Sequence, residues 1–272
     1  MRIKQYAIFA SMFMLAGTMN SCNNDSKGIQ EAFGIESRYD DFRDSKTWGK
    51  VVSKEIPVAA FSGIDLQGCA DVDFYQDDEV SVVITGNEKA LALYEVSVEK
   101  DMLTVRASEQ RRFTNHPEVL IEVHAPAIWK IRNVGTGDVD LKNTVALEGD
   151  LMVDADGTGD VDIDYIKCHK LSVRQTGTGD VDVKRGKCNV IDIESTGTGD
   201  VDIDAKATTV KTIVSGTGDA DLKVNCETLD ITANGTGTVE AKGKCGTLTK
   251  CCNGLGKIRT KDLRATKVNI ID

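Results

Sequence analysis

The stretch Gly157–Ile163, GTGDVDI, recurs along the chain and decides its fold. Copies of the motif, exact or decayed, begin at Gly135, Gly157, Gly177, Gly197, Gly216, Gly235 and Gly254. Their starts are separated by 22, 20, 20, 19, 19 and 19 residues. A nearly fixed period of this length is typical of stacked repeat architectures, in which each unit buries its apolar face against the next.

Each repeat reads as two short strands joined by turns. VDI and VDV alternate apolar and acidic residues, which predicts a strand with one buried face. A second alternating run follows, as in Leu171 with Val173 or Leu229 with Ile231. Two strands and their turns in one repeat make one coil of an all-β, single-stranded parallel β-helix, or β-solenoid. We expect the coils to stack at about 4.8 Å.

The glycines of the motif are predicted to form the corners of the coils. A coil must turn sharply at the same place in every layer, and glycine adopts positive φ without a Cβ clash. The predicted corner positions are Gly135, Gly137, Gly157, Gly159, Gly177, Gly179, Gly197, Gly199, Gly216 and Gly218. A dinucleotide-binding loop would need a helix after the glycines, and no helical period follows them.

Four cysteines follow the same period and predict a column of side chains. They are Cys168, Cys188, Cys226 and Cys245. Free cysteine is among the most buried residue types, so the column can be a buried ladder of thiols. An oxidising compartment would also permit disulfides between neighbouring layers, Cys168 to Cys188 and Cys226 to Cys245. Zinc is disfavoured because its cysteine ligands usually come in close pairs along the sequence.

The aspartates of the motif form two further columns, which are candidate calcium ligands. The first contains Asp138, Asp160, Asp180, Asp200 and Asp219; the second contains Asp140, Asp162, Asp182, Asp202 and Asp221. Clustered carboxylates suit Ca²⁺, but the calcium-binding β-roll motif recurs every nine residues, unlike this one. The alternative is that both columns are solvated edges that keep the sheet soluble. No other cofactor is predicted.

The N-terminus has the features of an exported, lipid-anchored protein. Residues 1–22 combine Arg2 and Lys4 with a short apolar run, too short for a membrane span of about 20 residues. Cleavage before Cys22 would leave a cysteine for lipidation, and an ordinary secretory signal is the alternative. The polar segment 23–49 is predicted to be a flexible tether. Together these features predict an outer-membrane lipoprotein, facing the periplasm or the cell surface.

Charge and pattern organise the rest of the chain. The sequence has 43 acidic and 33 basic residues, which argues against binding nucleic acid. Residues 50–134 alternate less regularly and are predicted to form broader coils that cap the stack, with Phe61 and Trp129 in the cap core. Residues 135–272 form the regular solenoid. Within Ala60–Gln76, the stretch Gly68–Phe74 is a degenerate copy of the motif.

The passages FSGIDLQGCADVDFYQ, DMLTVRAS and APAIWKIRNVGTGDVDL carry a family resemblance. With the repeats that follow, they resemble the head GIN domain family, whose members are described as adhesins and are common as lipoproteins in Bacteroidetes. The likeness covers about residues 51–250. It implies an all-β solenoid in the cell envelope, and it implies no catalytic residues.

An enzyme is disfavoured because the aspartates are spread evenly over the layers and no repeat shows a polar insertion. His116, His124 and His169 lack metal-ligand spacing. The first hypothesis is therefore a non-catalytic adhesin that presents an acidic surface to a protein or glycan. The alternative is a structural envelope scaffold that assembles with itself. A calcium-dependent polysaccharide-active enzyme is the least favoured reading.

Overall fold

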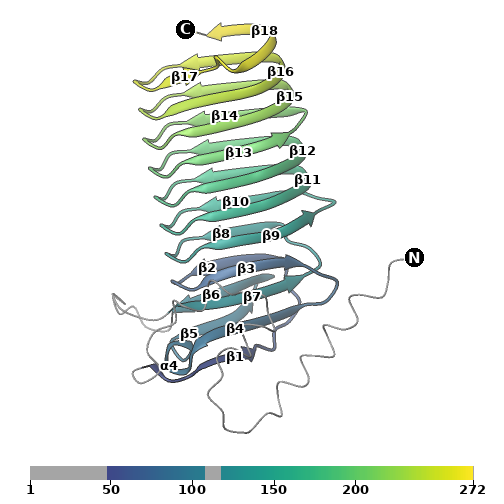
Figure 1. Cartoon of the computed structure of the whole chain (residues 1–272), viewed down its shortest axis with the longest axis vertical. Helices are drawn as coiled ribbons and strands as arrows, with labels where there is room; N and C mark the ends of the chain where they lie inside the picture. Colours follow the sequence, from purple (N-terminus) through teal and green to yellow (C-terminus); the bar gives the residue numbers. More distant parts are fainter. Residues whose placement is uncertain (1–47, 108–117, 272) are drawn as a thin grey trace, which may run out of the picture. The chain divides into compact units, whose positions relative to one another are not determined.

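The computed structural model describes residues 48–107 and 118–271, which form a β-solenoid (Figure 1). The first part of the chain contains β1 (Val51–Glu55), β2 (Gly63–Gln67), β3 (Asp71–Gln76), β4 (Ser81–Asn87), α4 (Glu88–Leu91), β5 (Tyr94–Glu99), β6 (Met102–Ala107), β7 (Val119–Ala125) and β8 (Lys130–Asn133). The repeats contain β9 (Val139–Ala146), β10 (Leu151–Ala155), β11 (Val161–Gln175), β12 (Val181–Ser195), β13 (Val201–Lys206), β14 (Thr209–Val214), β15 (Ala220–Ala233), β16 (Thr238–Cys252), β17 (Lys257–Arg259) and β18 (Leu263–Ile271).

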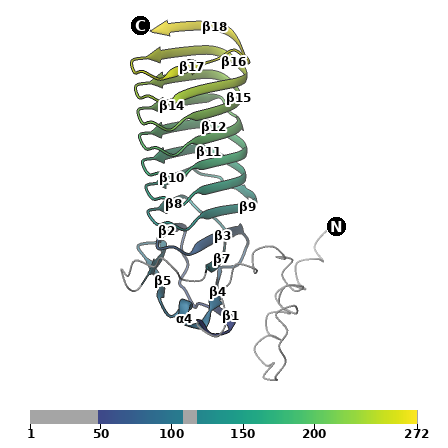
Figure 2. The same ribbon diagram turned by 60° about the vertical axis from the view of Figure 1, so that its left-hand side comes forward.

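Each repeat makes one coil, and the coils stack in parallel register (Figure 2). The first arm of a coil follows the GTGD corner and the second arm leads to the next corner. In β11 the first arm pairs Val161 with Val181 of β12, and the second arm pairs Leu171 with Ile191. The predicted period of about 20 residues therefore corresponds to one coil of the stack, and the predicted solenoid is confirmed.

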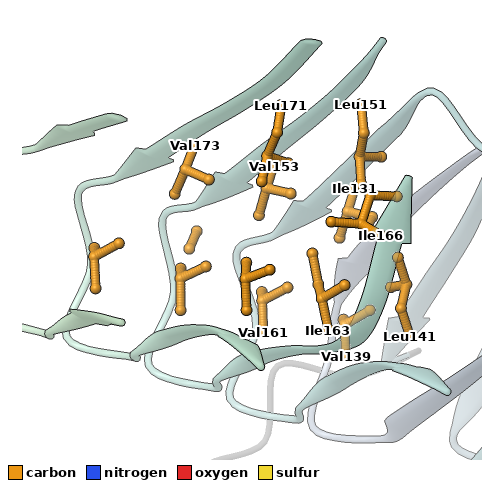
Figure 3. Close-up of a cluster of buried hydrophobic side chains, with 14 of the residues drawn as sticks. Ile131, Val139, Leu141, Leu151, Val153, Val161, Ile163, Ile166, Leu171 and Val173 are labelled. Carbon is orange, nitrogen blue, oxygen red and sulfur yellow. The ribbon is translucent and has the colours of Figure 1, made fainter. Parts of the chain in front are cut away.

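The core lies between the two arms of each coil. Figure 3 shows Val161 and Ile163 from first arms facing Leu171 and Val173 from second arms. The apolar residues of the motif form two columns, and every member is buried: Val139, Val161, Val181, Val201, Ala220 and Val239 in one, and Leu141, Ile163, Val183, Ile203, Leu222 and Ala241 in the other. Burying a Val, Leu or Ile side chain contributes about 1.5–3 kcal/mol, so the two-residue alternation is the main source of stability.

The physical reason why glycine is required at the corners differs from the one predicted. Among the described glycines only Gly49 and Gly243 have positive φ, so left-handed backbone is not the reason for the motif. A Cβ on Gly177 would instead collide with the carbonyl oxygen of Gly157 in the layer before it, and one on Gly179 with that of Gly159. The other predicted corner glycines meet the preceding layer in the same way. Glycine is required because the corners stack backbone on backbone.

The first part of the chain is less simple than the predicted series of broad coils. β2 and β3 lie between the coil of β6 and β7 and the coil of β8 and β9, out of sequence order. Outside these coils, β1 pairs with β4, β4 with β7 and β5 with β6, all antiparallel. Asp73 pairs in register with Asp140, which confirms Gly68–Phe74 as a copy of the motif.

Local details of this part include a hairpin and a helix. Lys100 and Asp101 have φ of 51° and 67° and form the tight turn of the hairpin that joins β5 to β6. The four-residue helix α4 was not expected from the sequence. Phe61 is buried as predicted, whereas the prediction for Trp129 is wrong, because this residue is 45% exposed. β8 begins only at Lys130, and Ile128 fills the core in its place.

One coil carries insertions, contrary to the expectation that no repeat does. Ile163 pairs with Leu141 but Tyr165 pairs with Thr144, so one extra residue bulges near Asn143. A second extra residue lies between Ala146 and Leu151, where the strand is interrupted. These two residues account for the longest interval between motifs.

The predicted signal segment 1–22, the lipidation site Cys22 and His116 lie outside the described residues, as does residue 272. Of the tether 23–49, only its last two residues are described. Within residues 48–107 and 118–271, no helix is long and apolar enough to cross a membrane.

Candidate functional site

The first aspartate column holds the corners together. The carboxylate of Asp160 accepts a hydrogen bond from the backbone N–H of Asp180 at 2.8 Å, and Asp180 accepts one from Asp200 at 2.7 Å. The same bond recurs from Asp71, Asp138, Asp200 and Asp219 to the layer that follows each of them. We call these six residues the corner aspartates. Each satisfies a backbone donor that the turn would leave unpaired, so their recurrence has a structural cause.

Polar side chains beneath the corners were not identified from the sequence. Gln175 is fully buried and donates to the carbonyls of Gly177 and Gly179 at 2.9 and 3.2 Å. Asn133 makes the equivalent bond to the Gly137 carbonyl and accepts from the Gly135 N–H. The only signal in the sequence is a polar residue where the inward position of a strand should be apolar.

The second aspartate column forms a continuous line of carboxylates on the outer side of the first arms. In stack order this acidic row contains Glu122, Asp73, Asp140, Asp162, Asp182, Asp202, Asp221 and Glu240. Lys142 neutralises its buried start, with Nζ 2.8 Å from Asp140 and 3.5 Å from Asp73. Lys242 pairs with Glu240 at 3.0 Å near the other end.

The middle of the acidic row forms no direct ion pairs among the described residues. Among the described residues, Asp162, Asp182, Asp202 and Asp221 form neither a direct ion pair nor a side-chain hydrogen bond. Lys184 attracts Asp162 and Asp182 without contacting either, and Lys242 does the same for Asp221. Partial burial and the neighbouring carboxylates Asp140 and Asp221 raise the pKa of Asp162 and Asp202 respectively. Partial burial likewise raises the pKa of Asp182, which Lys184 partly offsets and Asp164 reinforces. These groups repel one another, so a cationic partner would be favoured here.

The predicted calcium ligands are divided between the two columns. Asp138, Asp160, Asp180 and Asp200 bind backbone N–H groups, while Asp140, Asp162, Asp182 and Asp202 lie in the acidic row. Among the described residues, no three His, Cys, Asp or Glu side chains are grouped so as to hold a metal ion. Ca²⁺ takes about six to eight oxygen ligands, and calcium binding stays a prediction.

The cysteine column lies in the core wall. Cys168, Cys188, Cys226 and Cys245 are all buried, and the Sγ atoms of Cys168 and Cys188 lie 3.3 Å apart as free thiols. Burial raises the pKa of Cys226 to about 12, and a hydrogen bond to Cys188 together with burial raises the pKa of Cys168. Burial also raises the pKa of Cys245, whereas the hydrogen bond from Cys168 lowers the pKa of Cys188. The thiols of Cys168, Cys226 and Cys245 are therefore protonated at neutral pH and are poor nucleophiles.

The sequence matches one family model over nearly the whole described region. The model is described as "Putative auto-transporter adhesin, head GIN domain", and it matches residues 60–209 and 203–271. The chain belongs to this family. The resemblance expected from the sequence is thereby confirmed. A search of curated proteins finds no match.

Solved structures share the fold. A putative adhesin from Bacteroides fragilis is 25% identical, with a TM-score of 0.73 over 77% of this chain and 96% of its own. A putative adhesin from Parabacteroides merdae is 15% identical, with a TM-score of 0.61 over 82% and 97% of the two chains. A putative lipid binding protein from Parabacteroides distasonis is 16% identical, with a TM-score of 0.51 over 82% and 98%. The last two are similar in fold alone.

Proposed function

We propose that this family member is a non-catalytic adhesive protein of the cell envelope. It is anchored through a lipid on Cys22 and binds its partner through the acidic row. The observation that carries the proposal is the set of four consecutive carboxylates, from Asp162 to Asp221, that make no direct ion pair among the described residues. A regular line of like charges stabilises no part of the fold, since its members repel one another.

The chemistry of the row favours a protein partner with a basic surface over nucleic acid. One carboxylate per layer, at a spacing of about 4.8 Å, can face a row of Lys or Arg side chains. Catalysis is disfavoured because the row repeats the same group in every layer. A general acid and a general base need two carboxyl groups in different environments.

Attachment of the purified protein to a panel of immobilised basic and acidic extracellular proteins tests this function. We expect retention on basic proteins that weakens as salt rises, because exposed charges are screened beyond about 8 Å at physiological ionic strength. The partner should be recovered with its mass unchanged. Absence of retention, or cleavage of the partner, would contradict the proposal.

A second candidate function, assembly of copies of the chain, is favoured by the surface of β18. Val268 pairs in register with the buried Leu248, yet it is 52% exposed, and Ile270 is 65% exposed. Residues 253–271 carry five basic residues and one acidic residue, whereas residues 51–107 carry 11 acidic and four basic residues. A head-to-tail contact would cover the apolar side chains, match these charges and generate a filament.

Light scattering over a range of protein concentrations distinguishes this candidate. Assembly predicts a mass that grows with concentration and falls in Ile270→Asp or in high salt. The Thr266→Asp variant is a control for added charge on the same strand. A constant monomer mass would exclude assembly.

A further inference from the structure

The coil with the insertions opens a hollow on the outer side of the second arms. Its volume is about 520 Å³, within the range of small-ligand sites. The lining residues are Trp129, Glu148, Gly149, Asp150, Leu151, Met152, His169, Lys170 and Ser172. The break in the repeat between Ala146 and Leu151 forms one side of it. The hollow lies on the arm of the coil opposite the acidic row.

Trp129 is the exposed aromatic platform of this hollow. It is 45% exposed, and Met152 beside it is 40% exposed; the other exposed large apolar residues among those described are Leu255 and three residues of β18. The backbone N–H of Trp129 donates to the Ser62 carbonyl at 2.8 Å. The backbone carbonyl of Trp129 accepts a hydrogen bond from the Met152 N–H at 2.9 Å. The backbone on both sides is therefore fixed, and the indole is presented from a rigid position.

The rest of the hollow offers both donors and acceptors of hydrogen bonds. Asp150 and His169 are joined at 3.0 Å, and both remain about 60% exposed (62% and 61%). Lys170 reaches Asp192 at 3.3 Å, while Glu148 and Ser172 complete the polar rim. A Cβ on Gly149 would meet no atom within 4 Å, so nothing fills the space above this residue.

From this juxtaposition we infer that the hollow is a binding site for a pyranose saccharide, stacked on Trp129. A pyranose ring has an apolar C–H face that packs on an aromatic ring, and its hydroxyls both donate and accept hydrogen bonds. The site has those two features side by side. A protein partner would favour a wider apolar centre than one indole and one thioether, and the net charge of −10 disfavours a nucleic acid.

The inference extends the proposed adhesive role with a second, separate contact surface. If it holds, the protein attaches to a glycan through the second arms and to a basic protein through the first arms. Neither contact requires a covalent step.

Binding to immobilised neutral hexose, N-acetylhexosamine and uronic acid oligosaccharides, followed by titration calorimetry on the full mature chain, tests the site. We expect at least one class to bind and the affinity to fall about tenfold or more in Trp129→Ala. Gly149→Leu adds a side chain at a lining residue, where a Cβ meets no atom within 4 Å, and should also weaken binding. Tyr165→Ala removes an aromatic ring outside the hollow, where it contacts Arg185, and should bind as the unaltered protein does.

A Trp48→Phe background leaves Trp129 as the single tryptophan, so saccharide binding should shift its fluorescence. The inference fails if no oligosaccharide binds, if Trp129→Ala binds unchanged, or if the hollow variants lose a protein partner instead. Retention on basic proteins is measured in parallel. If only the saccharide inference fails, Trp129→Ala is still retained on basic proteins. If the adhesive role itself fails, neither the unaltered protein nor any variant is retained.

Discussion

A single added methyl group at a corner should destabilise the solenoid, although replacing glycine with alanine ordinarily stabilises a protein by restricting the unfolded chain. In Gly179→Ala the new Cβ would collide with the carbonyl oxygen of Gly159. The backbone of Gly159 cannot move away, because it is itself stacked on Gly137 of the layer before. Overpacking typically costs about 1–3 kcal/mol, and here no flexible side chain can move away. We therefore expect a loss of about 2–3 kcal/mol.

Thermal unfolding measures this effect against a matched control. For a chain of this size each kcal/mol corresponds to a shift of about 2–4 °C in Tm, so Gly179→Ala should lower Tm by roughly 4–12 °C. Gly149→Ala adds the same methyl group in open space. It should be neutral or stabilising by up to about 1 kcal/mol, because alanine restricts the unfolded chain. Equal effects at the two positions would refute the argument that stacking selects the corner glycines.

Three further predictions concern the acidic row, the core and the cysteines. The raised pKa of Asp182 means that its contribution to stability is present below the unfolded pKa of about 3.9 and is lost as pH rises through the folded pKa. Asp182→Asn should therefore raise Tm at pH 7 and leave it unchanged near pH 3; the opposite order would show that the carboxylate is stabilised by an unrecognised partner. Thr212 is fully buried in register with Ile193 and Ile231, and its hydroxyl has no hydrogen-bond partner among the described residues. Thr212→Val should raise the free energy of unfolding by about 1–2 kcal/mol in urea denaturation, and a loss of stability would mean that the hydroxyl is satisfied. Cys168, Cys188, Cys226 and Cys245 should be alkylated only after unfolding, whereas the exposed Cys252 should react in the native protein. Failure of the four to react even when unfolded without reductant would show that they are disulfides.

The regular repeats could be predicted closely from the sequence because one physical rule governs them. Alternation at Val161 and Ile163 fixes the buried side, and the constant period fixes the register, so the apolar columns and the cysteine column follow directly. The reason for the glycines did not follow, since positive φ and close stacking select the same residue. The distinction needs the carbonyl of the layer before.

The first part of the chain and the hollow could not be predicted, because they depend on contacts between segments distant in sequence. The insertion of β2 and β3 between later strands leaves no local pattern. A capping role for the first part predicts Trp129 in the cap core, but β8 begins only at Lys130 and the indole stays exposed. The 22-residue interval between Gly135 and Gly157 was the one visible sign of the hollow.

The central claim is that the corner aspartates stabilise the fold whereas the acidic row binds the partner. Two triple variants that remove the same charge test this claim most directly. Asp160→Ala with Asp180→Ala and Asp200→Ala removes three corner hydrogen bonds, worth about 0.5–1.5 kcal/mol each. Asp162→Ala with Asp182→Ala and Asp202→Ala removes three carboxylates of the acidic row that form no direct ion pair among the described residues and whose pKa is raised.

Attachment to basic proteins is measured for both variants at a temperature where both are folded. We predict that the corner variant is less stable but attaches normally, and that the row variant is at least as stable as the unaltered protein but no longer attaches. Equal loss of attachment in the two variants would contradict this prediction, because adhesion would then follow net charge and not the acidic row.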